Sequence, residues 1–207
     1  MSQVPPVTGQ EALRRLQDGN AKYRWGLAAR PRCDVQRMRE TAAGGQQPFA
    51  AVLACADSRV PVELLFDQGI GDLFVVRVAG NVCGPDQIAS LEYAAEHLGA
   101  PLVVVLGHTQ CGAVTAAASG PAAGGHLGSL LEKIRPAVDR AKEGCPHLGG
   151  PQFVTAAVEA NVWLAASELM RESAAVAEGV AAGRISVVGA VYDLVTGEVR
   201  WLDPPLP

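Results

Sequence analysis

Three residues in this sequence have the types and spacing of a metal site: Cys55, His108 and Cys111. Thiolate sulfur and imidazole nitrogen are ligands that zinc prefers in proteins. His108 and Cys111 are three residues apart, so on a turn that enters a helix they would face the same way. Three protein ligands leave one tetrahedral position open, which is typical of a catalytic zinc site, whereas a structural site needs a fourth ligand. The sequence offers no second close pair of Cys and His.

Each signal is weak when taken alone. A solitary cysteine at the end of a strand is usually a small packed residue, and His-x-x-Cys by itself rarely identifies a metal site. Asp57 and Arg59 follow Cys55 closely, and a carboxylate and a guanidinium at this spacing can pair. Such pairs are also common on surfaces, where they stabilise little. The interpretation therefore depends on whether the fold brings Cys55 to His108.

The apolar runs of the sequence indicate how these residues are positioned. Four runs rich in Val, Leu and Ile lack alternation, which is typical of parallel strands covered on both faces: residues 49–54, 72–77, 102–106 and 185–192. Helical spacing over residues 86–98 and 154–170 separates them, which favours an α/β fold with right-handed crossovers. Because parallel strands end at the same edge of a sheet, Cys55 after the first run can meet His108 after the third.

The remaining segments complete the predicted fold. We expect an amphipathic helix over residues 9–25 capped by Thr8, one or two helices with loops over 28–47, and a loop over 120–128. Thr196-Gly197 predicts a turn that leads into an antiparallel edge strand over residues 199–202. The expected fold class is α/β, with a mainly parallel central sheet of four strands plus an antiparallel edge strand, flanked by helices and preceded by an N-terminal helical extension. We expect one domain over residues 1–207, with a helical arm over 1–47 and an α/β zinc-binding core over 48–207.

Composition excludes several classes of protein. The chain has 207 residues, 49% of them hydrophobic and 18% charged, which is typical of a globular domain. Its net charge of −4 and its 5% aromatic content argue against a nucleic-acid partner. No apolar run approaches the roughly 20 residues of a membrane span, and the start lacks the features of a secretory signal, so we expect a cytoplasmic protein without a membrane partner. Five cysteines argue against a disulfide framework, and we expect Cys33, Cys83 and Cys145 to pack.

The combined pattern resembles the β-class carbonic anhydrases. Cys55-Ala56-Asp57-Ser58-Arg59, followed by His108-x-x-Cys111-Gly112, carries the resemblance, which extends over nearly the whole chain from Glu11-Ala12-Leu13 to Val191-Tyr192-Asp193. It implies one Zn²⁺ per subunit on Cys55, His108 and Cys111, with Asp57 and Arg59 as a catalytic dyad. It implies reversible hydration of CO2 to bicarbonate and a proton, by attack of zinc-bound hydroxide that the dyad orients. It also implies a homo-oligomer, a dimer or a tetramer of dimers, with active sites near the subunit interface.

The resemblance also assigns a substrate pocket. Gln46, Phe74 and Tyr93 match the pocket of the plant-like subgroup, Ala79 stands where plant enzymes usually have Val, and Gly112 completes the substrate-binding set. Another bacterial subgroup has the Trp of an allosteric bicarbonate site where this chain has Val52, so we expect no such regulation. No proton shuttle can be named, and three histidines are expected to be surface or core residues: His97, His126 and His147.

Charge explains why a dyad is needed. Two thiolates make the zinc core formally neutral, so bound water is a weaker acid than in a site of three histidines. Asp57, kept ionised by Arg59, can accept the hydrogen bond of this water, and Gln46 could donate to the developing bicarbonate. Alternatives are a carbonyl sulfide or carbon disulfide hydrolase on the same fold, and a non-catalytic zinc protein. A nucleotide-binding domain would need a glycine-rich loop after the first strand, which Cys55 to Arg59 does not provide.

Overall fold

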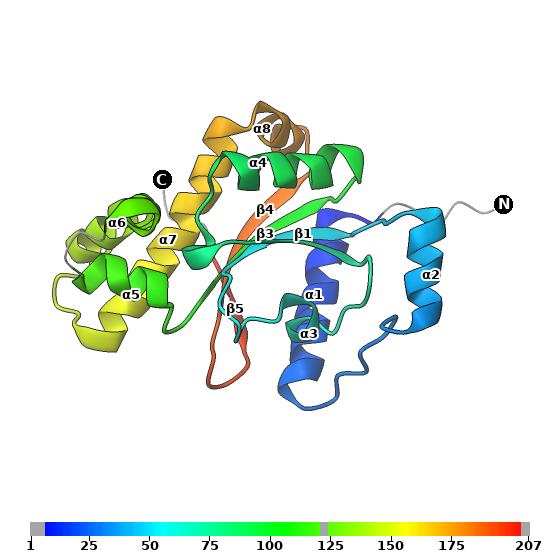
Figure 1. Ribbon diagram of the computed structural model, residues 1–207, viewed down its shortest axis with the longest axis horizontal. Coiled ribbons are helices and arrows are strands. Elements are labelled where there is room, and N and C mark those ends of the chain that lie inside the picture. Colours follow the sequence, from blue (N-terminus) through cyan, green and yellow to red (C-terminus); the bar gives the residue numbers. More distant parts are fainter. Residues whose placement is uncertain (1–6, 121–123, 204–207) are drawn as a thin grey trace.

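The computed structural model describes residues 7–120 and 124–203, and in this part of the chain five strands form one sheet (Figure 1). The strands are β1 (Ala50–Ala54), β2 (Leu73–Arg77), β3 (Leu102–His108), β4 (Ser186–Tyr192) and β5 (Val199–Leu202). Their order across the sheet is β2-β1-β3-β4-β5. The first four are parallel and β5 is antiparallel to β4, so the predicted fold class is confirmed.

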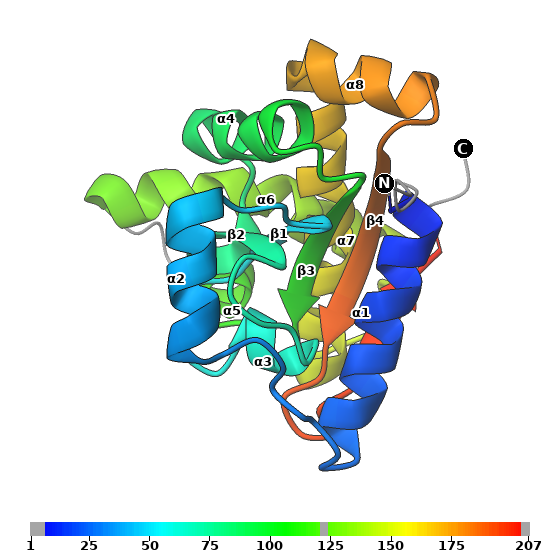
Figure 2. The same ribbon diagram turned by 90° about the vertical axis from the view of Figure 1, so that its right-hand side faces the viewer.

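The central strands are apolar because both of their faces are covered. Every residue of β1 and β3 is buried, as expected for parallel strands with helices on either side. One layer consists of α1 (Gly9–Arg24) and α3 (Val62–Leu65), which share an apolar cluster with Val52 and Val104. On the opposite side of the sheet lie further helices, some packed directly on the strands and some on other helices (Figures 1 and 2). They are α4 (Pro85–Glu92), η2 (Tyr93–His97), α5 (Gly112–Ser119), α6 (Gly125–Gly144), α7 (Gly150–Glu172) and α8 (Ala174–Ala181).

The N-terminal segment contains two helices of different character. Thr8 caps α1 as predicted, because its hydroxyl oxygen accepts the N–H of Glu11 at 3.2 Å. Ala12 and Leu16 of α1 are fully buried against the sheet. The helix expected within residues 28–47 is α2 (Val35–Gly44), which has no buried residue. Figure 1 shows α2 standing apart from the sheet. The proposed division between arm and core at residue 47 stays a prediction.

Two predicted segments differ from the structure. The loop predicted over residues 120–128 is wrong in its second half, because α6 begins at Gly125; residues 121–123 lie outside the described part of the chain. The buried side chains of Leu131 and Ile134 stabilise α6 against the sheet-covering helices, and the helix extends back through the glycines. The single helix predicted over 86–98 changes at Tyr93 into the five-residue π-helical turn η2.

Candidate metal centre and active site

The carboxyl ends of two neighbouring strands bring three potential ligands together. Cys55 directly follows β1, His108 is the last residue of β3, and Cys111 caps the start of α5. Because β1 and β3 are parallel neighbours, with Ala54 opposite Leu106, both ends open at the same edge of the sheet. The two sulfur atoms and an imidazole nitrogen all lie within 4.8 Å of one another, and all three residues are buried. The predicted meeting of Cys55 with His108 and Cys111 is therefore present in the structure.

His108 is oriented for binding a metal. Its Nδ1 lies 2.9 Å from the carbonyl oxygen of Thr109, and a carbonyl can only accept, so Nδ1 carries the proton. Nε2 then presents a lone pair, and among the described residues it has no hydrogen-bond partner although the side chain is fully buried. A metal-binding histidine usually donates its other N–H to a carbonyl or carboxylate in this way. The unpartnered Nε2 fits a metal ion at this position.

The two cysteines interact strongly. The adjacent Cys111 thiol and the His108 ring, together with the N–H groups of Asp57 and Gly80, lower the pKa of the Cys55 thiol. The two N–H groups lie 3.4 Å and 3.3 Å from Cys55 Sγ, respectively. Interaction with Cys55 and burial raise the pKa of the Cys111 thiol, because two adjacent thiolates repel each other. A dication between the sulfur atoms would remove this repulsion, so the donor set fits zinc in its chemistry.

Asp57 and Arg59 form a bidentate ion pair beside the three ligands. Asp57 Oδ2 accepts Arg59 Nη2 at 2.7 Å, and Oδ1 accepts both the Arg59 Nε at 3.0 Å and its backbone N–H at 2.9 Å. These bonds from Arg59 hold the pKa of the Asp57 carboxyl well below its usual range. Asp57 Oδ2 also lies 3.8 Å from His108 Nε2. An ionised carboxylate therefore faces the space where the unpartnered imidazole nitrogen points.

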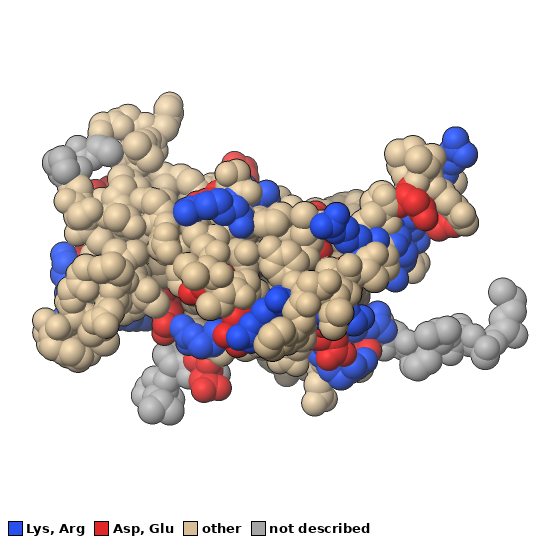
Figure 3. All heavy atoms as spheres, turned by 90° about the horizontal axis from the view of Figure 1, so that it is seen from below, with Lys and Arg blue, Asp and Glu red and all other residues tan. Residues whose placement is uncertain are grey.

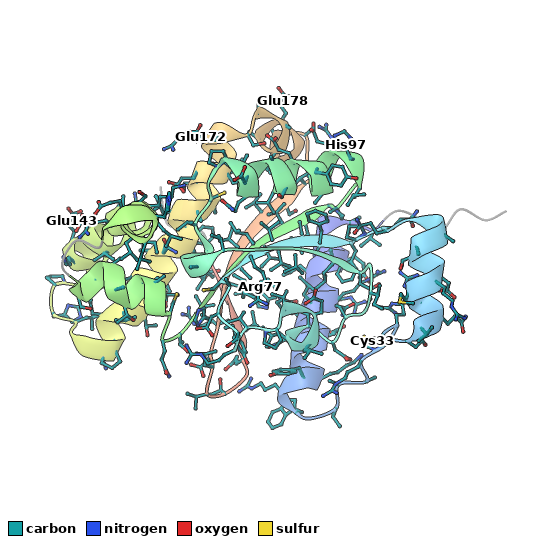
Figure 4. The ribbon with its side chains drawn as sticks, viewed as in Figure 1. Cys33, Arg77, His97, Glu143, Glu172 and Glu178 are labelled. Atoms are coloured by element: carbon teal, nitrogen blue, oxygen red, sulfur yellow. The ribbon has the colours of Figure 1, made fainter. Side chains whose placement is uncertain are left out.

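Arg77 holds the loop that carries both Cys55 and Asp57, and we did not assign it a role from the sequence. From the end of β2, its Nε donates to the carbonyl oxygen of Cys55 at 3.1 Å and its Nη2 to that of Asp57 at 2.6 Å. Figure 4 shows Arg77 near the middle of the molecule, beside the sheet. In the sequence, Arg77 is a charged residue at the end of an otherwise apolar strand, and this pattern could have pointed to a structural role.

The predicted substrate-binding residues lie in two separate places. Ala79 begins the 3-10 turn η1 (Ala79–Asn81), next to the Gly80 that contacts Cys55, and Gly112 begins α5 beside Cys111. The other three lie near the amino end of the sheet. Gln46 precedes β1 and Cys55 follows it, and the five residues of β1 span about 16 Å.

Phe74 and Tyr93 lie together, away from the ligands of their own chain. Phe74 is opposite Ala51 in the sheet, and its ring centroid lies 6.1 Å from that of Tyr93. Tyr93 is 49% exposed and lines an open hollow of about 540 Å³ with Gln46 and residues of α2. Within one chain the structure does not bring these side chains to the metal ligands.

The remaining histidines and cysteines lie outside the cluster of three ligands. His97 packs against Tyr93 with ring centroids 5.3 Å apart, at the far end of η2 (Figure 4), and His126 and His147 are exposed. Cys83 is buried, which raises its pKa to about 12. The expectation that Cys33 packs is wrong, because it lies exposed in the loop between α1 and α2, where its thiol donates to the Pro31 carbonyl.

Figure 3 shows acidic and basic side chains interspersed on the visible face, with no extended basic patch there. Among the described residues, no helix combines the length and apolar character needed to cross a lipid bilayer.

Comparisons with known proteins agree on one family. The family model described as carbonic anhydrase matches residues 50–199. Carbonic anhydrase 2 of Mycobacterium tuberculosis is 37% identical over 200 residues, which cover 94% of this chain and 93% of that protein. The crystal structure of the β-carbonic anhydrase CafA of Aspergillus fumigatus matches with a TM-score of 0.76 and 28% identity, over 96% of this chain and 92% of the other. A structure from work on two tetrameric β-carbonic anhydrases of Sordaria macrospora matches with a TM-score of 0.74 and 26% identity, over 81% and 87% of the two chains.

Proposed function

This chain belongs to the β-class of the carbonic anhydrase family, and from that premise we propose that it hydrates CO2 reversibly to bicarbonate and a proton with Zn²⁺ on Cys55, His108 and Cys111. The observation that carries the proposal is the buried, unpartnered Nε2 of His108, whose ring lies in one cluster with the sulfur atoms of Cys55 and Cys111 and which faces the carboxylate of Asp57. A zinc ion at this position would lower the pKa of a water molecule and so supply the nucleophile near neutral pH.

Asp57 performs the orienting step. Arg59 keeps its carboxylate ionised and fixes both oxygens, so the carboxylate can accept a hydrogen bond from the nucleophile but cannot readily donate one. Accepting that bond aims the lone pair of the nucleophile away from Asp57 and toward CO2. Arg77 supports the same step, since it fixes the backbone carbonyls on both sides of this turn.

A second copy of the chain would complete the substrate pocket. Gln46, Phe74 and Tyr93 lie too far along the sheet to serve the ligands of their own chain, yet Gln46 and Tyr93 border an open hollow and Phe74 packs against Tyr93. Two exposed apolar residues of α2, Val35 and Met38, lie on the same N-terminal segment, and this helix has no buried residue. In our proposal these surfaces pack on a partner protomer, where the three side chains line the partner's pocket. A homodimer, or a tetramer of dimers, follows from this arrangement.

Stopped-flow CO2 hydration and metal analysis on the same sample test the proposal. We expect one zinc per chain and CO2 hydration that disappears with chelation and returns with zinc. Turnover of carbonyl sulfide and carbon disulfide is measured in parallel, because the same ligands could serve a hydrolase of these analogues. Zinc without hydration of CO2 would contradict the proposed activity and favour either such a hydrolase or a non-catalytic zinc protein. The expected cytoplasmic location stays a prediction.

A further inference from the structure

Gly80 is a backbone donor to Cys55 that only a glycine can provide. Its N–H lies 3.3 Å from Cys55 Sγ, and its φ of 67° is in the left-handed region. A Cβ at this position would lie 2.6 Å from Ile134 Cδ1 and 3.1 Å from Ala113 Cβ. Gly80, in η1, is therefore tightly enclosed by side chains of α5 and α6, and its N–H points at the sulfur atom of Cys55.

The carbonyl of the same glycine is held by a side chain from α7. Asn161 Nδ2 donates to the Gly80 carbonyl oxygen at 2.8 Å, across 81 residues of sequence. Asn161 is 2% exposed, and the other buried residues of α7 are apolar: Ala157, Val158, Val162, Ala165, Ala166 and Leu169. Asn161 is thus the one polar residue on the buried face of α7, and its amide reaches the residue that contacts Cys55.

We propose that Asn161 is a positioning residue for the metal centre: it fixes the Gly80 peptide so that the Gly80 N–H points at Cys55 Sγ. The Gly80 carbonyl belongs to the peptide group between Gly80 and Asn81, and the bond from Asn161 fixes the orientation of this group. The Gly80 N–H belongs to the preceding peptide group, between Ala79 and Gly80, and the left-handed φ of Gly80 fixes how this group is oriented relative to the first. Without Asn161 the buried carbonyl would have to turn toward another donor, and the N–H of Gly80 would turn away from the sulfur atom. This inference rests on the proposed zinc site, because the sulfur atom concerned is one of its ligands.

The position of α7 strengthens the inference. Val158 and Val162, one turn before and one residue after Asn161, pack against Gly107, which directly precedes His108 in β3. Figure 2 shows α7 alongside β3 and β4. The same stretch of α7 therefore borders the His108 strand and holds the donor to Cys55, so two of the three ligands depend on it.

Two substitutions test this role against a simple packing role. Asn161→Leu keeps most of the volume and removes the donor, and Asn161→Ala removes the donor and leaves space. Leu169→Ala is the matched control, since Leu169 is fully buried on the same helix two turns further on. For each variant and the wild type, the zinc dissociation constant is measured by chelator competition, and the thiolate-to-metal absorption is recorded with Co²⁺ in place of zinc. Unfolding by denaturant is followed without metal.

We expect both Asn161 variants to weaken zinc binding by about 10- to 100-fold, as is typical when a residue behind the ligands is lost, and to shift the Co²⁺ absorption. Leu169→Ala should lose stability and bind zinc as the wild type does. The inference is overturned if Asn161→Leu and Asn161→Ala bind zinc as tightly as Leu169→Ala does. It is also overturned if both Asn161 variants fail to fold while Leu169→Ala folds, because Asn161 would then serve the stability of the fold. If the wild type itself fails to bind zinc, the proposed function fails first, so the two failures are distinguishable.

Discussion

The substitution Gly107→Ala tests whether the contact between α7 and β3 sets the position of His108. Gly107 directly precedes His108 in β3, and an added Cβ would lie 2.8 Å from Val162 Cγ2 and 3.0 Å from Val158 Cγ1. Such approaches are too close for carbon atoms, so either α7 or the end of β3 must shift. Overpacking of this kind costs about 1–3 kcal/mol of unfolding free energy. In a chain of this size each kcal/mol lowers Tm by about 2–4 °C.

Gly189→Ala is the matched control. Gly189 lies in β4, where an added Cβ would lie 2.8 Å from Val162 Cγ1 and 3.2 Å from Trp163 Cζ2. It crowds the same valine from the neighbouring strand, but its partner in β3 is Val105 and not a residue beside a ligand. We therefore expect a similar loss of stability from both variants. Zinc affinity should fall by about 10- to 100-fold in Gly107→Ala and remain unchanged in Gly189→Ala.

The assay combines two measurements on each variant. Denaturant unfolding without metal gives the stability change, and chelator competition gives the zinc dissociation constant. The double variant Gly107→Ala with Val162→Ala removes the nearest crowded methyl group, leaves that of Val158, and should recover part of the lost affinity. If Gly107→Ala and Gly189→Ala lose equal stability and bind zinc equally well, crowding by α7 does not reach His108 and the reasoning is refuted.

Further predictions concern the ligands, the ion pair and the pocket. Cys111→Ser should abolish zinc content and CO2 hydration together, and a fully active variant would exclude Cys111 as a ligand. Asp57→Ala should keep one zinc per chain while kcat falls by about 10²- to 10⁴-fold; unchanged kcat would refute the orienting role. Arg59→Ala should let the lowered pKa of Asp57 rise toward its ordinary value of about 3.9, so the variant's activity relative to wild type should fall further as pH drops toward that value; a constant ratio would argue against the pairing. If Gln46 serves a partner's site, inactive Cys111→Ser chains mixed with Gln46→Ala chains should regain activity in mixed dimers, and no recovery would place Gln46 elsewhere.

The metal ligands could be predicted from the sequence because the strands that carry them are strongly patterned. Uninterrupted apolar runs identify β1 and β3 as covered on both faces, and parallel strands share one edge for their carboxyl ends. That geometry is enough to bring Cys55 to His108 without knowledge of any side-chain contact. The antiparallel strand β5 was predictable for a similar reason, since Gly197 allows the turn that reverses the chain.

The residues behind the ligands could not be predicted in the same way. Asn161 looks like an ordinary polar residue in a helix, and its contact with Gly80 depends on which face of α7 meets η1. Arg77 stands out in the sequence as a charged residue at the end of an apolar strand, but its bonds to the backbone carbonyls of Cys55 and Asp57 leave no trace there. Gln46 and Tyr93 lie far from the ligands of their own chain because they are at the opposite end of the strands. In our proposal they line the pocket of a second copy of the chain, and the strand pattern of one chain does not reveal a pocket that two chains share.

The placement of the ligands on two strands also has a consequence for the order of events during maturation. β1 and β3 are adjacent in the sheet, but along the chain they are separated by α3, β2, η1, α4 and η2. Contacts between residues so far apart in sequence form late, because closing the long loop between them costs conformational entropy. Before that pairing only His108 and Cys111 are near each other, and two donors make a poor zinc site. We therefore expect the chain to bind its metal after folding. Newly made apoprotein should then be folded before zinc binds, and its folding should not require zinc.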